Sequence, residues 1–172
     1  GMLSLVPDAR AALVGNVLNA RTSAADGAAN VFYSNYVPMP ATGVVDTVDI
    51  YYQGSSYAPF TMYQLRPTAT AGQYEVKYSS GPITPSGTAN SVLKIPLAKG
   101  GAYVRPGDIF AHYGRGIPYS DTPSGLNITN PQMIYFPSNT APAVNTTISL
   151  PSAAFPSSSY VRDYASAVNH EW

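Results

Sequence analysis

The sequence predicts an all-β protein, an antiparallel β-sandwich of the jelly-roll type with about eight or nine strands. Hydrophobic residues make up 45% of the 172 residues, and 14 glycines and 16 prolines interrupt the chain as they do between short strands. From residue 43 onward, apolar and polar residues alternate with a period of two, and no sustained helical period interrupts them. Strands without helical crossovers must pair antiparallel, in two packed layers or a closed barrel, and we expect two layers.

The chain is long enough for one domain with a substantial core, and we expect a single sandwich domain over residues 1–172. Residues 1–42 are expected to form an irregular or mixed segment packed on it. Four apolar residues of this segment have helical spacing, namely Leu13, Val14, Val17 and Leu18. Gly15 and Asn16 weaken a helix there, so VGNVLNARTS equally fits the start of a strand.

The strand candidates follow one another at intervals of about ten to fifteen residues, a spacing typical of an all-β sandwich. They are residues 47–53, 60–66, 73–78, 91–97, 108–113, 132–136, 145–150 and 159–168. In QYEVKY, residues 73–78, the alternation is complete. We therefore expect Tyr74, Val76 and Tyr78 on one buried face, with the opposite face in water.

Charge is low and balanced, with 9 Lys and Arg residues against 9 Asp and Glu residues. A chain without a basic face is not expected to bind nucleic acid, and no apolar run reaches the roughly 18 residues of a membrane span. The absence of cysteine excludes disulfides, thiolate nucleophiles and cysteine-based zinc sites. We expect no metal and no cofactor. The residues after Met2 lack the pattern of a secretory signal, although the composition favours an extracellular or surface location.

Charged and aromatic groups gather in residues 103–121, YVRPGDIFAHYGRGIPYSD. Asp108, His112 and Ser120 have the composition of an acid, a base and a nucleophile. On a strand, however, Asp108 and His112 would stand about 13 Å apart, far beyond hydrogen-bond distance. RPGD, residues 105–108, instead fits a type II turn, with proline at the second position and glycine at the third. The first half of the segment is therefore predicted to be a turn and a strand.

The strand after this turn is expected to present two different faces. Ile109, Ala111 and Tyr113 would face one layer. Phe110 and His112 would face the other, so His112 and Tyr113 would lie on opposite sides of the sheet.

The second half of the segment, GRGIPYSD, is the predicted ligand-binding loop, since binding residues often lie on loops held by a rigid scaffold. Tyr113, Arg115, Tyr119 and Asp121 combine flat aromatic faces with planar hydrogen-bonding groups. A sugar ring offers apolar C–H patches and hydroxyl groups, and these residue types can bind both.

Other polar residues have less specific interpretations. Arg66 and His112 are additional candidates for the ligand site, and Arg66 could equally pair with a carboxylate or stack on a tyrosine. Asp46 and Asp49 point to opposite faces of a strand, so we expect solvated side chains rather than a shared calcium ion.

The succession of FTMYQLRP, QYEVKY, VLKIPL and YVRPGDIFAHYG resembles noncatalytic extracellular β-sandwich modules of the jelly-roll or galactose-binding-like type. The resemblance covers residues 43–120. It implies a sandwich fold and a binding or adhesive role, and no ligand residue is carried over from it.

The leading functional hypothesis is a noncatalytic module that binds glycan or another cell-surface ligand through loop residues at the rim of the sandwich. The alternative is a structural or assembly subunit of a homo-oligomeric surface or virion-type particle, whose weakly charged faces bury against copies of itself. A third hypothesis is a hydrolase in which His112 meets Asp46 or Asp163 from another strand.

Overall fold

The computed structural model describes residues 11–25, 31–35, 37–55, 59–120, 133–137, 141–150 and 161–172. These residues form thirteen β-strands in two antiparallel sheets and one short 3-10 helix, η1 (Ala98–Gly100), with no α-helix among them. The prediction of an all-β antiparallel fold is confirmed. The strands outnumber the eight or nine expected because several short pairing segments carry too few residues to show an alternating pattern.

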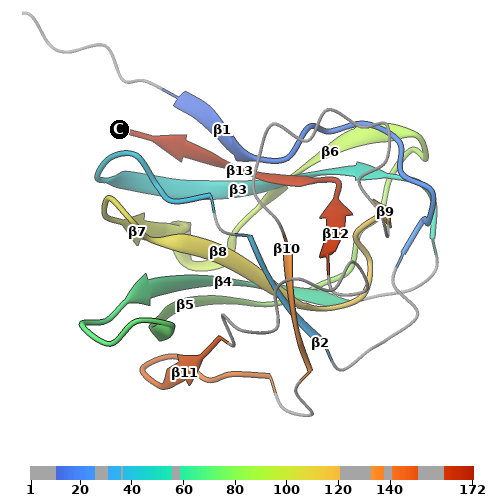
Figure 1. Cartoon of the computed structure of the whole chain (residues 1–172). Helices are drawn as coiled ribbons and strands as arrows, with labels where there is room; N and C mark the ends of the chain where they lie inside the picture. The colour runs from blue at the N-terminus through green and yellow to red at the C-terminus, as the bar shows by residue number, and fades with distance from the viewer. Residues whose placement is uncertain are drawn as a thin grey trace, which may run out of the picture.

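The first sheet has five strands in the order β1-β13-β3-β6, with β7 also paired to β3. Its members are β1 (Ala11–Gly15), β13 (Ser166–Glu171), β3 (Gly43–Tyr52), β6 (Ser91–Pro96) and β7 (Ala102–Val104). In Figure 1, β1, β13, β3 and β6 lie above three strands of the other sheet, β8 (Ile109–Gly114), β4 (Phe60–Pro67) and β5 (Gln73–Ile83).

The second sheet has eight strands in the order β11-β5-β4-β8-β2-β10-β12-β9. They are β11 (Thr147–Ser149), β5 (Gln73–Ile83), β4 (Phe60–Pro67), β8 (Ile109–Gly114), β2 (Val31–Asn35), β10 (Met133–Pro137), β12 (Val161–Tyr164) and β9 (Tyr119–Ser120). The predicted segment 159–168 therefore divides into β12 and β13, which belong to different sheets.

The N-terminal segment contributes a strand to each sheet, β1 to the first and β2 to the second. The choice left open for the residues around Leu13 and Val14 is thus a strand. Gly15 ends it with a φ of +142°, and a Cβ there would come within 2.8 Å of the Ala167 Cα on the neighbouring strand. The residue that weakens a helix therefore serves the close approach of two strands.

One core is shared by the two sheets. Val48 and Ile50 of β3 are fully buried in it together with Phe60 and Met62 of β4, and Tyr164 of β12 joins them. A second, smaller cluster lies on the other side of the eight-stranded sheet, where Ile148 of β11 packs against it.

The two faces predicted for β8 are confirmed. Phe110 belongs to the shared core, whereas Ile109 and Ala111 belong to the second cluster and Tyr113 packs against it. The His112 ring lies among core side chains on the Phe110 side.

The single buried face predicted for residues 73–78 is wrong at its end. Tyr74 and Val76 contact the second cluster, but Tyr78 belongs to the shared core on the opposite side of the sheet. The register against β4 shifts between the pairs Gln64↔Tyr78 and Leu65↔Val76, which leaves one extra residue on β5. A β-bulge of this kind reverses the alternation of the residues beyond it, here as far as the second register shift between Thr61 and Tyr63.

Candidate functional site

The turn predicted at RPGD is present between β7 and β8. Gly107 has a φ of +90°, and the Asp108 amide donates a hydrogen bond of 3.1 Å to the Arg105 carbonyl. Both features agree with the type II turn expected from the Pro-Gly pair.

Asp108 is committed to this turn. Its carboxylate is 1% exposed, and Arg66 donates to both of its oxygens at 2.9 Å. Gln64 Nε2 at 2.8 Å and the Arg105 amide at 2.9 Å complete its hydrogen bonds. The hydrogen bond to Asp108 raises the pKa of Arg66, with burial opposing it. Of the three interpretations of Arg66, the structure therefore supports pairing with a carboxylate.

His112 lies in the interior, with 3% of its surface exposed. Its ring makes edge contacts with Phe60 and Tyr164, at centroid distances of 6.4 and 4.6 Å. The ring also lines a cavity of about 20 Å³ between the sheets, next to Ser166. That volume admits a water molecule but no organic ligand.

The two acids predicted as partners of His112, Asp163 and Asp46, bond to other residues. Asp163 forms an ion pair of 3.1 Å with Arg21, and both side chains are almost fully buried. Asp46, the other acid considered, accepts a hydrogen bond of 3.3 Å from Asn169. Neither arrangement supplies the acid and base that a hydrolase needs.

Sequence reasoning missed Arg21, which fastens the segment before β2 to the end of β12. Besides the Asp163 carboxylate, its guanidinium donates to the Asp163 carbonyl at 3.1 Å and to the Val17 carbonyl at 2.8 Å. The Gln53 side chain bonds both the amide and the carbonyl of Arg21. One signal was present in the sequence. Only 10% of the residues are charged, and a charged side chain that becomes buried is almost always paired, so each arginine was worth matching with an acid.

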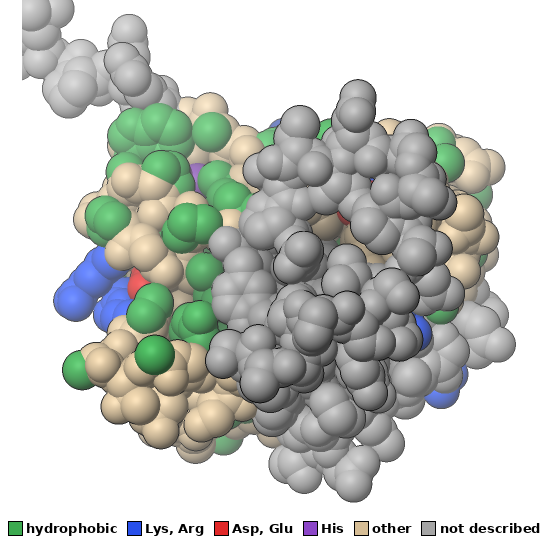
Figure 2. All heavy atoms as spheres, in the orientation of Figure 1, with side chains coloured by type: hydrophobic (Ala, Val, Ile, Leu, Met, Phe, Trp, Pro, Cys, Tyr) green, Lys and Arg blue, Asp and Glu red, His purple; other side chains and the backbone are tan. Residues whose placement is uncertain are grey.

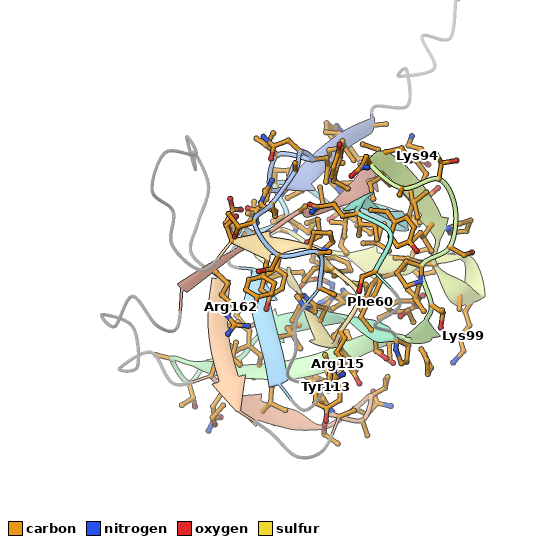
Figure 3. The ribbon with its side chains drawn as sticks, turned by 90° about the vertical axis from the view of Figure 1, so that its right-hand side faces the viewer. Phe60, Lys94, Lys99, Tyr113, Arg115 and Arg162 are labelled. Carbon is orange, nitrogen blue, oxygen red and sulfur yellow. The ribbon has the colours of Figure 1, made fainter. Side chains whose placement is uncertain are left out.

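The predicted binding loop does not bring its tyrosines together. Tyr113 and Arg115 lie close to each other in Figure 3, at the end of β8, and Arg162 lies apart from them. The Arg115 amide is fixed by a 2.9 Å hydrogen bond to the Pro59 carbonyl.

Tyr119 belongs to a different cluster. The Arg162 guanidinium lies 4.5 Å from the centre of its ring, and the Tyr164 ring lies 5.5 Å away. Two neighbouring groups thus already contact this ring. Asp121, the fourth predicted member, lies outside the described residues.

The expectation of solvated carboxylates is wrong for Asp49, which is 1% exposed. It sits mid-sheet on β3, between Lys94 of β6 and Ala167 of β13, and accepts a 3.0 Å hydrogen bond from the Thr47 hydroxyl. Burial raises the pKa of Asp49, and the Thr47 hydrogen bond and the Lys94 charge oppose this shift.

Among the described residues, no three histidine or acidic side chains come together in a way that could hold a metal ion. None of the helical structure in the described part of the chain has the length and apolar character of a membrane span. Comparison with protein-family models, with curated proteins and with solved structures finds no match to the chain.

Proposed function

We propose that this chain is a noncatalytic β-sandwich of the jelly-roll type that serves as an assembly module. The strand order supports the fold. Taking β1, β2, β3, β4, β5, β6, β8 and β13 as strands one to eight, the sheets run 1-8-3-6 and 5-4-7-2. A jelly roll consists of eight strands wound as two Greek keys over two sheets, and this order fits that description.

The observation that carries the function is the exterior of the five-stranded sheet. Leu13, Val92 and Tyr103 are 54%, 45% and 79% exposed, and all three belong to strands of this sheet. They lie toward the borders of the sheet, with Val92 and Tyr103 beside opposite ends of β3 and Leu13 on β1. Exposed apolar side chains that share one face are typical of a protein interface. Charged side chains are few over the described surface seen in Figure 2, and the centre of a protein interface is likewise poor in charge.

The buried polar groups support a noncatalytic role. Asp108 and Asp163 are each held by an arginine, and His112 is enclosed by aromatic rings. These groups stabilise loops and strand ends, so they are not free to act on a substrate.

Sedimentation velocity of the purified chain over a wide range of concentration tests the proposal. We expect a stable dimer or larger species at micromolar concentration. A chain that sediments as a monomer up to millimolar concentration contradicts the assembly function.

A second candidate is the glycan-binding or surface-ligand module, which the closeness of the Tyr113 and Arg115 side chains at the end of β8 favours. Both side chains are half-buried, so they combine a fixed position with an accessible surface. A glycan array screened with the wild type and with Arg115→Ala tests it, with Lys99→Ala as the exposed cationic control. Binding that is lost only in Arg115→Ala supports this candidate, and an array without signal excludes the glycan form of it.

A further inference from the structure

The register of the five-stranded sheet defines one continuous outer face. Val14, Val48 and Ile95 point into the shared core, so their neighbours along each strand point outward. The apolar members of this outer face are Leu13, Val44, Tyr51, Val92, Pro96 and Tyr103.

Cross-strand pairing arranges these residues in rows. Val44 of β3 lies beside Tyr103 of β7, and Tyr51 of β3 lies beside Val92 of β6. Leu13 stands at the other edge of the sheet on β1. Between Leu13 and Pro96 the same row carries Asn169 of β13 and Thr47 of β3, so the apolar groups surround a polar centre of the face.

The charges of the outer face suit a second copy of the same face. Lys94 is exposed on β6 at one side, beside the buried Asp49 of β3, and Glu171 is exposed on β13 at the other. Lys94 projects at the surface beside β6 (Figure 3). A two-fold axis in the plane of the face, midway between these residues, would place each Lys94 opposite the partner's Glu171. Nucleic acid would instead need several cations, and this face offers one lysine.

The size of the face also suits a dimer. With strands about 4.8 Å apart and about 3.3 Å per residue, a four-strand face centred on the ten-residue β3 covers on the order of 500 Å². Two such faces together bury roughly 1,000 Å², which is the smallest area expected of a specific interface and lies in the range of weak, reversible association.

We infer that two copies of this chain associate through the outer face of the five-stranded sheet, with Lys94 of each opposite Glu171 of the other. The inference rests on the proposed assembly function and names the surface and the partner that carry it out. Both partners are the same chain, so the contact is isologous.

The test is sedimentation velocity of Val92→Lys and Tyr103→Lys beside the wild type. A lysine that replaces an apolar side chain within the contact must be desolvated without a partner, so we expect the dimer Kd to rise at least tenfold in each variant. Val144→Lys is the matched control, because Val144 is also 41% exposed but precedes β11 of the other sheet. Its Kd should equal that of the wild type, and far-UV circular dichroism spectra that match the wild type should show that all three variants are folded.

Charge exchange identifies the pairing. Glu171→Lys should weaken association, and the double variant Lys94→Glu/Glu171→Lys should restore it. If the dimer Kd is the same in the wild type and in every one of these variants, the inference is wrong but the assembly function stands. A wild type that stays monomeric overturns both and leaves the face to a different kind of partner.

Discussion

Arg66 donates two parallel hydrogen bonds to Asp108, from Nε to Oδ1 and from Nη2 to Oδ2, both of 2.9 Å. Arg66 lies on β4, and Asp108 directly precedes β8. The pair therefore joins neighbouring strands at the point where the RPGD turn ends and β8 begins. A planar guanidinium matches a carboxylate in this way, whereas an ammonium group does not.

Removing the guanidinium should therefore destabilise the fold. Arg66→Ala leaves a buried carboxylate with only amide donors, and we expect it to lower the free energy of unfolding by about 3 kcal/mol. Arg66→Lys should recover less than half of this loss because lysine cannot make both bonds. Urea unfolding measures the effect as a lower midpoint with an unchanged slope.

Lys77→Ala is the control for this pair. Lys77 forms a 3.0 Å ion pair with Glu75 whose side chains are 29% and 40% exposed, so its removal should cost less than about 1 kcal/mol. Equal losses for Arg66→Ala and Lys77→Ala would show that the Asp108 contact contributes no more than a surface pair.

Arg21 and Asp163 offer a sharper case, since both side chains are buried. Arg21→Met should lower the free energy of unfolding by about 3–5 kcal/mol, because it leaves the buried Asp163 carboxylate without its cation. The double variant Arg21→Met/Asp163→Leu should recover much of that loss. A double-mutant cycle from thermal or urea unfolding measures the coupling. Additive losses would mean that Arg21 acts through its bonds to backbone carbonyls rather than through Asp163.

Gly43 is expected to be intolerant of a side chain although nothing in the sequence pattern marks it. A Cβ at this position would lie 2.0 Å from the Glu171 carbonyl oxygen and 2.7 Å from His170 Nε2. Gly43→Ala should therefore separate the start of β3 from β13 and lower the free energy of unfolding by roughly 3 kcal/mol, measured by urea unfolding.

Gly81→Ala provides the comparison, because a Cβ there meets nothing within 4 Å and only its φ of +68° opposes alanine. That backbone strain costs about 1–2 kcal/mol. A larger loss in Gly81→Ala than in Gly43→Ala would contradict the importance of the close approach.

Much of the fold could be predicted because it rests on local patterns. The alternation around Val48 and Ile50 identifies β3, and the Pro106-Gly107 pair identifies the turn before β8. The bulge opposite Gln64 could not be predicted, since an extra residue on one strand is defined only by its partner strand. Register between distant strands is likewise invisible in a single sequence.

The candidate site was less predictable for the same reason. Tyr113 and Tyr119 stand six positions apart in YGRGIPYSD, residues 113–121. However, β8 carries Tyr113 to one face of the sheet, while β9 pairs with β12 and brings Tyr119 to Arg162. The partners of Asp108 and Asp163, 42 and 142 residues away, are likewise set by the topology.

His170 should make stability depend on pH. It is fully buried on β13, and burial lowers its pKa from the usual 6.5, with the nearby Ala41 backbone opposing the shift in part. The unfolded chain therefore binds a proton more readily than the folded protein does. The stability from neutral His170 is fully present above about pH 6.5 and is lost as the pH falls from there through the folded pKa, with a slope of at most about 1.4 kcal/mol per pH unit.

Urea unfolding at several pH values between 5 and 8, compared for the wild type and His170→Leu, isolates this contribution, because the carboxylates titrate in both proteins. We expect a flatter profile in His170→Leu across this window. Trp172, the only tryptophan of the chain, stacks on the His170 ring at a centroid distance of 4.8 Å, so its fluorescence reports on the same site. If the two proteins lose stability in parallel between pH 7 and 5, His170 binds a proton equally well in the folded and unfolded states. The folded protein then does not hold His170 neutral.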